Sequence, residues 1–224
     1  MNGYSCVIFD IDGTLTQTNT LIFDTFNHVT GKYLQKTYTP KEIVAMFGPP
    51  EEIAIERLVG PDRIDNAMKD FISYYEKHFP GKAEIFTGIR EILEFLKTNG
   101  LRLAVFTGKG RSTTLITLDL IGITKYFDII VTGSDVVNHK PSAEGIRRIL
   151  EKFNLPPERA LMVGDAVSDI KAAHEAGVPV AAVVWDSYAK DKVMGMDVDF
   201  LFHNVEDFDR WIKTRITGTG VKAV

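Results

Sequence analysis

Five short apolar runs, each followed by small or acidic residues, constrain the fold of this chain more than any other feature. They span residues 6–9, 103–106, 127–131, 160–163 and 178–184. Continuous runs rich in Val and Ile are typical of strands buried on both faces, as in a parallel sheet. Amphipathic helical patterns lie between the runs, over residues 89–99, 111–121, 142–153 and 168–177. This alternation predicts an α/β fold with a doubly wound, mostly parallel sheet.

One long stretch interrupts the alternation. Residues 16–86 contain no convincing strand, and they show helical patterns over residues 22–33, 41–47, 51–59 and 63–79. An insertion of this size after the first strand predicts a separate small helical domain that is hinged at both joins. We therefore expect residues 1–15 and 87–224 to form a Rossmann-like α/β catalytic core, and residues 16–86 to form an inserted α-helical domain.

Composition excludes several classes of protein. The 224 residues are 45% hydrophobic and 25% charged, which is typical of a globular protein and not of a disordered one. A net charge of -4 argues against a nucleic-acid binder, although a few well-placed cations can still bind phosphate locally. A single cysteine, Cys6, fits a reducing compartment. With neither a leader nor a membrane-length apolar run, we expect a cytoplasmic protein without a membrane partner.

Acidic residues follow two of the expected strands. Asp10 and Asp12 come after the first strand, and Asp165 follows the fourth, with Asp169 four residues further on. Ligands of parallel sheets bind at the carboxyl ends of the strands. Carboxylates crowded there repel one another and call for a cation, and an all-oxygen site suits Mg²⁺. Each Asp-Gly or Gly-Asp pair taken singly is equally well explained as a turn, so only their combination favours a site.

Four motifs, taken in their order along the chain, resemble those of the haloacid dehalogenase superfamily. They are Asp10-Ile11-Asp12-Gly13-Thr14-Leu15, Thr107-Gly108, Lys140-Pro141 and Gly164-Asp165-Ala166-Val167-Ser168-Asp169. Each motif alone is a weak signal, whereas all four in this order and spacing are a strong one. The helical insert between the first two motifs is similar to the cap domain of the phosphoglycolate-phosphatase-like branch. The resemblance therefore implies that residues 16–86 are a cap.

The resemblance implies a role for each acidic residue. Asp10 resembles the nucleophile that attacks phosphorus and forms an aspartyl-phosphate. Asp12 resembles the general acid that protonates the leaving oxygen and then the base that activates water. The family's Mg²⁺ is held by the carboxylates of Asp10 and Asp165 and by the backbone carbonyl of Asp12. Asp169 is expected to orient the metal's waters or a nearby lysine instead of ligating directly.

The same resemblance assigns the remaining motifs to phosphate binding. Thr107 and Gly108 are expected to hold phosphoryl oxygens at the start of a helix, and Lys140 to supply a cation to them and to the nucleophile. Lys109 could meet additional charge on the substrate, but most lysines of this kind are solvated surface residues. A tight turn in the cap is expected to approach the leaving group, although a plain connector between helices explains it equally well. That turn comprises Phe47, Gly48, Pro49 and Pro50.

These expectations describe a Mg²⁺-dependent phosphatase acting on a small phosphorylated metabolite. Phosphoglycolate, inorganic pyrophosphate and sugar or nucleoside phosphates are the substrates that the resemblance implies, while Asp12 argues against dehalogenation. A phosphomutase of the β-phosphoglucomutase type is the alternative enzyme, but Ile22 stands near the position of the mutases' histidine. A non-catalytic phosphate-binding regulatory protein is the second alternative, and the four intact motifs make it the weakest. Both a monomer and a homodimer remain open.

Overall fold

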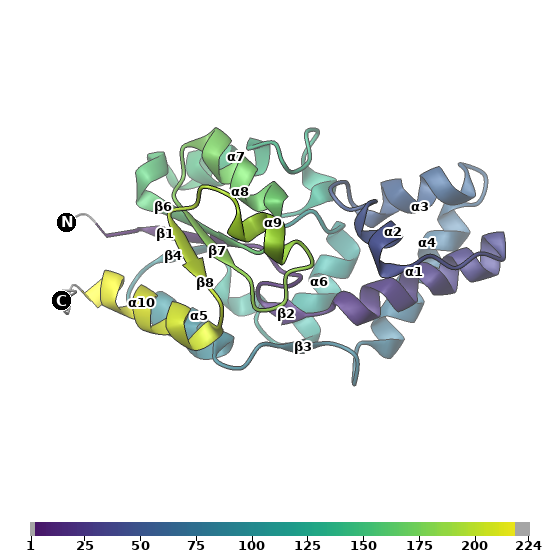
Figure 1. Ribbon diagram of the computed structural model, residues 1–224, viewed down its shortest axis with the longest axis horizontal. Coiled ribbons are helices and arrows are strands. Elements are labelled where there is room, and N and C mark those ends of the chain that lie inside the picture. Colours follow the sequence, from purple (N-terminus) through teal and green to yellow (C-terminus); the bar gives the residue numbers. More distant parts are fainter. Residues whose placement is uncertain (1–2, 218–224) are drawn as a thin grey trace.

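The computed structural model describes residues 3–217 and contains a six-stranded parallel sheet (Figure 1). The strand order is β5-β4-β1-β6-β7-β8, so the chain runs outward from β1 in both directions. The strands are β1 (Cys6–Phe9), β4 (Arg102–Phe106), β5 (Ile129–Val131), β6 (Ala160–Gly164), β7 (Val180–Val183) and β8 (Phe200–Phe202). This arrangement confirms the predicted α/β fold with a doubly wound sheet.

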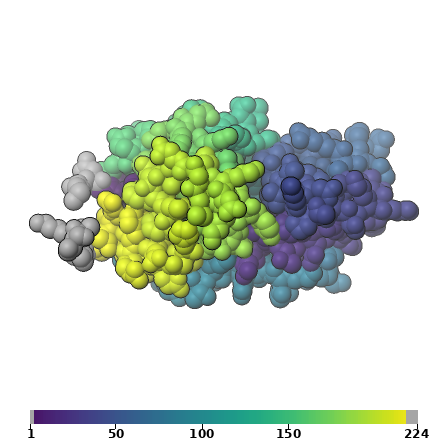
Figure 2. All heavy atoms as spheres, in the orientation of Figure 1, coloured from purple at the N-terminus to yellow at the C-terminus, as the bar shows by residue number. Residues whose placement is uncertain are grey.

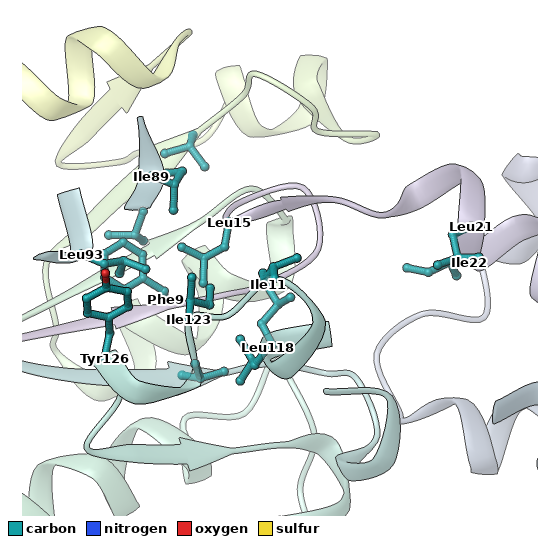
Figure 3. Close-up of a cluster of buried hydrophobic side chains, with 14 of the residues drawn as sticks. Phe9, Ile11, Leu15, Leu21, Ile22, Ile89, Leu93, Leu118, Ile123 and Tyr126 are labelled. Carbon is teal, nitrogen blue, oxygen red and sulfur yellow. The ribbon is translucent and has the colours of Figure 1, made fainter. Parts of the chain in front are cut away.

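Helices cover both faces of this sheet. They are α5 (Ile89–Thr98), α6 (Arg111–Leu120), α7 (Glu144–Phe153), α8 (Val167–Ala176), α9 (Lys190–Met194) and α10 (Val205–Thr217). Val7 and Phe9 of β1 belong to one buried apolar cluster with residues of α5, α6 and α10, part of which Figure 3 shows. Cys6 and Ile8 belong to a second cluster with residues of α7, α8 and α9. Alternate residues of β1 therefore pack into two separate apolar clusters.

The insert forms a lobe beside the sheet, and Figure 2 shows its purple and blue atoms next to the green and yellow core. It consists of α1 (Asn19–Leu34), α2 (Pro40–Val44), α3 (Glu51–Val59) and α4 (Ile64–His78). Helix α4 packs against both α1 and α3. The rings of Phe26 and Phe71 pack edge to face, with 5.3 Å between their centres. The lobe thus has its own apolar contacts, and its buried residues belong to the same apolar cluster as those of the core.

Three short strands depart from the expectations. Two of them, β2 (Thr16–Gln17) and β3 (Glu84–Ile85), pair antiparallel where the insert leaves and rejoins the core, so the expectation of no strand within residues 16–86 was wrong. The third is β8 at the edge of the main sheet, where only five strands were expected. Strands of two or three residues are too short to show a hydrophobic period. Among residues 3–217, no helix combines the length and apolar character needed to cross a bilayer.

Candidate active site

Adjacent strand ends bring the acidic motifs together. Asp10 directly follows β1 and Asp165 directly follows β6, and these two strands pair in parallel. The backbone N–H of Asp10 donates to the carbonyl of Val163 at 2.9 Å, which continues the strand pairing to the site itself. Carboxylate oxygens of Asp10, Asp165 and Asp169 all lie within 4.8 Å of one another, and all three residues are buried. The structure therefore forms the acidic cluster that the strand ends predicted.

Asp169 lies in the first turn of α8 and joins two parts of the site. Its Oδ2 accepts a hydrogen bond of 3.0 Å from the backbone N–H of Ala166, and its Oδ1 lies 2.6 Å from the Lys140 Nζ. Gly164 leaves the space for this carboxylate, because a Cβ at that position would lie 2.4 Å from Asp169 Oδ2. Asp169 therefore contacts Lys140, and its part in orienting this lysine or the waters of a metal ion stays a prediction.

Lys140 supplies the positive charge of the cluster. Its Nζ lies 2.9 Å from Asp10 Oδ1 and 4.7 Å from the centre of the Phe106 ring. Burial alone would lower the pKa of Lys140, but the charges of Asp10 and Asp169 outweigh burial and raise it. Lys140 therefore stays protonated, and it contacts the residue predicted to be the nucleophile.

One ammonium group does not balance three buried carboxylates. Burial raises the pKa of Asp10 to about 7, although the Lys140 charge opposes this shift. Burial, together with the charges of Asp10 and Asp169, also raises the pKa of Asp165 well above its ordinary value. The Thr14 hydroxyl donates to Asp165 Oδ1 at 3.2 Å. The carboxylate oxygens here can serve as metal ligands, and their negative charge exceeds the positive charge that Lys140 supplies. Such a pocket fits a divalent cation such as Mg²⁺.

The side chain of Asp12 has different partners. Its Oδ1 accepts a hydrogen bond from the Thr18 hydroxyl, and both carboxylate oxygens lie 3.3 Å from Lys109 Nζ. A backbone hydrogen bond of 2.9 Å from Gly13 to Thr16 forms the turn that follows Asp12, and the positive φ of 80° at Gly13 favours glycine. A Cβ on Gly13 would also lie 2.6 Å from Asp165 Oδ2. The two carboxylates of the first motif thus have separate environments.

Lys109 is the site residue whose burial and partners the sequence interpretation did not predict. It is buried, and its Nζ lies 4.6 Å from the centre of the Tyr75 ring as well as beside Asp12. The expectation of a solvated surface lysine was therefore wrong, because α4 of the insert covers Lys109. The one signal available in the sequence was its place directly after Thr107 and Gly108.

Thr107 and Gly108 follow β4 on the other side of β1. The backbone N–H of Thr107 donates to the Val131 carbonyl at 3.1 Å, and the Thr107 hydroxyl accepts from the backbone N–H of Lys109 at 3.2 Å. Both Thr107 and Gly108 line the same cleft as Asp10. They therefore lie beside Asp10 in one cleft, and their part in holding a phosphate group stays a prediction.

The comparison with protein families decides the class of this site. Residues 7–183 match the family described as haloacid dehalogenase-like hydrolase. The chain belongs to this family. It is 32% identical over 201 residues to the pyrophosphatase PpaX of Halalkalibacterium halodurans, an alignment that covers 90% of this chain and 93% of that protein. This haloacid dehalogenase-like hydrolase is accordingly an enzyme of the phosphatase type.

Solved structures share the fold of this haloacid dehalogenase-like hydrolase. A haloacid dehalogenase-like family hydrolase from Streptococcus pneumoniae is 27% identical, with a TM-score of 0.75 over 94% of this chain and 99% of that one. A predicted phosphoglycolate phosphatase from Haemophilus somnus has a TM-score of 0.80 over 93% and 97% of the two chains. Because the sequence identity to the Haemophilus somnus protein is 24%, this similarity shows only that the two proteins share a fold.

A cleft of about 480 Å³ joins the core of the hydrolase to its helical insert. The predicted turn reaches this cleft, since Phe47, Gly48 and Pro49 line it. Gly48 lies directly on the second motif, because a Cβ on Gly108 would lie 3.2 Å from the Gly48 carbonyl oxygen. Pro50 packs instead near Gly133, where an added Cβ would lie 3.0 Å from Pro50 Cδ. The turn is thus next to the phosphate-binding motif, and its part in substrate selection stays a prediction.

Proposed function

We propose that this protein is a Mg²⁺-dependent phosphatase that hydrolyses a small phosphorylated metabolite through an aspartyl-phosphate on Asp10. One observation carries the proposal: the buried Asp10 carboxylate lies 2.9 Å from Lys140 Nζ and within 4.8 Å of two further carboxylates, in a cleft that the insert covers. A carboxylate held beside an ammonium group and a place for a metal ion can approach an anionic phosphate.

Asp10 is the nucleophile in this proposal. One of its oxygens forms a bond to phosphorus as the bond between phosphorus and the leaving oxygen breaks. Lys140 holds the Asp10 carboxylate and offsets the negative charge of the phosphoryl oxygens. Thr107 and Gly108 contribute donors on the β4 side of the same cleft. Lys140 and the second motif thereby fix the phosphate next to Asp10.

Asp12 carries the proton in both steps. It donates a proton to the leaving oxygen in the first step, and in the second it accepts a proton from the water that attacks the aspartyl-phosphate. The second step releases inorganic phosphate and restores the Asp10 carboxylate. Thr18 and Lys109 hold the Asp12 side chain away from the acidic cluster, which separates the proton carrier from the nucleophile.

The carboxylates of Asp10 and Asp165 and the backbone carbonyl of Asp12 would hold Mg²⁺. When it is bound, the metal supplies positive charge that reduces the repulsion between the Asp10 carboxylate and the phosphate. Asp169 keeps Lys140 in place beside the ligands. Oxygen ligands from carboxylates and a carbonyl are typical of Mg²⁺ sites.

Pyrophosphate, phosphoglycolate and sugar or nucleoside phosphates are the candidate substrates, and the first two agree with the names of the relatives. Ile22 lines the cleft with an apolar side chain that cannot transfer a proton, which disfavours the phosphomutase alternative. The experiment is phosphate release from p-nitrophenyl phosphate and a metabolite panel with Mg²⁺. We expect Asp10→Asn and chelation by EDTA each to abolish release, and undiminished turnover in the Asp10→Asn variant would contradict the proposal.

A further inference from the structure

The cap side of the cleft is apolar. Seven aliphatic or aromatic residues of the insert line it, namely Ile22, Phe26, Val44, Met46, Phe47, Ala54 and Phe71. Among the described cap residues that line the cleft, Glu51 is the one with a charged side chain. A second phosphate or a carboxylate on the leaving group would therefore lose water against this wall without gaining a cation from the cap.

Glu51 crosses from the insert to the core and bonds to the start of a core helix. Its Oε2 accepts a hydrogen bond of 2.7 Å from the backbone N–H of Gly110, and its Oε1 accepts one from the Thr113 hydroxyl. Gly110 precedes the ten-residue helix α6. The first N–H groups of a helix attract negative charge, and Glu51 already uses this attraction. An anionic part of a substrate would have to compete with it.

Glu52 adds negative charge beside Glu51. A Cβ on Gly110 would lie 2.5 Å from both carboxylate oxygens of Glu52, which shows how closely this side chain approaches the same helix start. Among the described residues, the buried Oε2 of Glu52 has no hydrogen-bond partner. Burial and the charge of Glu51 raise the pKa of Glu52. This corner of the cap–core boundary thus holds two acidic groups, and the Gly110 N–H and the Thr113 hydroxyl already donate to one of them.

The lysines that line the cleft do not cancel the negative charge of Glu51 and Glu52. The two buried ones already face carboxylates: Lys109 faces Asp12 and its charge also acts on Glu51 and Glu52, while Lys140 faces Asp10. Lys171 and Lys192 also line the cleft, but both are exposed residues of the core. An exposed ammonium group is solvated and screened by salt, so it offsets little of the charge of Glu51.

We propose that Glu51 is a specificity-determining residue that selects phosphate monoesters with an uncharged, largely apolar leaving group. The selection has two parts: the Glu51 carboxylate occupies the Gly110 N–H and the Thr113 hydroxyl at the start of α6, and the apolar cap wall contacts the leaving group. This inference rests on the proposed phosphatase function and narrows its substrate class. Phosphoglycolate and pyrophosphate, whose leaving groups carry negative charge, are then poor substrates.

Two aryl phosphates of nearly equal size test the inference, because 4-carbamoylphenyl phosphate and 4-carboxyphenyl phosphate differ mainly in the charge of the leaving group. For the unmodified enzyme with Mg²⁺, we expect kcat/KM to be at least about tenfold higher for the carbamoyl compound. Glu51→Gln removes the charge and keeps an oxygen acceptor, so the preference should fall to about threefold or less. Pyrophosphate hydrolysis should rise in the same variant.

Two further variants separate charge from structure. Glu56→Gln removes an exposed charge from the same helix and should leave the preference unchanged. Glu51→Asp keeps the negative charge and should keep the preference, even if its stability is lower. Equal kcat/KM for the two compounds in the unmodified enzyme would overturn the inference alone, and so would an unchanged preference in Glu51→Gln. No hydrolysis of either compound, with Asp10→Asn indistinguishable from the unmodified protein, would overturn the phosphatase proposal and the inference with it.

Discussion

Lys109 Nζ lies 3.3 Å from each carboxylate oxygen of Asp12 and so connects the end of β4 to the end of β1. Burial is the largest single effect and would lower the pKa of Lys109, but the charges of Asp12, Tyr75 and Glu51 together outweigh burial and raise it. The Tyr75 ring, 4.6 Å from the ammonium group, adds a cation–π contact from the insert. Lys109 is therefore a fixed positive charge that restricts the Asp12 side chain to one orientation.

Lys109→Met should lower kcat about tenfold, because Asp12 loses the partner that orients it for proton transfer. The methionine keeps the apolar contact with Tyr75, so the protein should remain folded. Steady-state kinetics with p-nitrophenyl phosphate measures the effect. Lys125→Met is the matched control, since Lys125 also lies over a tyrosine ring, that of Tyr126, but is exposed. Equal kcat values in the two variants would show that Lys109 does not orient Asp12.

Lys140→Met should reduce kcat/KM by about 100-fold or more, because the nucleophile and the phosphoryl oxygens lose their buried cation. The affinity for Mg²⁺ should not decrease, since the three carboxylates would then lack their protein counter-charge. Phosphate release and Mg²⁺ titration of the rate measure the two quantities. Lys152→Met, an exposed change on α7, serves as the control. Loss of Mg²⁺ affinity without loss of the limiting rate would contradict the role given to Lys140.

The metal-free protein should become less stable as the pH rises from about 5 to about 7.5 because of Asp10. The pKa of Asp10 is raised from 3.8 to about 7, so between these values the folded state binds more protons than the unfolded chain. The free energy of unfolding contributed by Asp10 therefore decreases as the pH rises through this range. Thermal unfolding in EDTA measures it, as the difference between the unmodified protein and Asp10→Asn.

Added Mg²⁺ should reverse this loss at about pH 7.5, because an ion that binds the folded state alone raises its stability by mass action. The increase in Tm should be smaller for Asp10→Asn, which has one carboxylate fewer in the cluster. A Tm difference between the two proteins that stays constant from about pH 5 to 7.5 would mean that Asp10 does not bind its proton as the structure indicates.

The sequence predicted the parallel core because strands such as β1 and β6 are continuous apolar runs. It also placed Asp10, Asp165 and Asp169 together, since the carboxyl ends of adjacent parallel strands meet at one edge. Both predictions depend on local pattern and on general rules of strand connection. The motif order likewise sufficed for the family, whereas the roles of the individual residues stay predictions.

Contacts between the insert and the core were beyond the sequence. Lys109 of the core contacts Tyr75 of α4, and Glu51 of α3 contacts Gly110, which lies 59 positions further along the chain. Neither pair shares a helix or a strand, so no hydrophobic period connects its members. Their meeting depends on how four helices pack over the sheet, which is decided by the sum of many apolar contacts. For that reason a lysine that resembled a surface residue is buried in the site.

Gly164→Ala should impair both stability and activity, because the new Cβ would lie 2.4 Å from Asp169 Oδ2. Asp169 would have to move and weaken its bond to Lys140, while β6 is held on both sides by paired strands. We expect a loss of about 1–3 kcal/mol in the free energy of unfolding. We also expect at least about tenfold lower kcat/KM, since Lys140 would lose its orientation. Denaturant unfolding and steady-state kinetics measure the two effects.

Gly31→Ala is the matched control for this substitution. Gly31 lies within α1, and a Cβ there would meet no other atom within 4 Å. Because alanine favours the helix more than glycine does, this variant should gain about 0.5–1 kcal/mol in the free energy of unfolding and keep its activity. The two glycine-to-alanine substitutions should therefore change the free energy of unfolding in opposite directions. If Gly164→Ala instead left kcat/KM unchanged, Lys140 would not need its contact with Asp169 to stay beside Asp10.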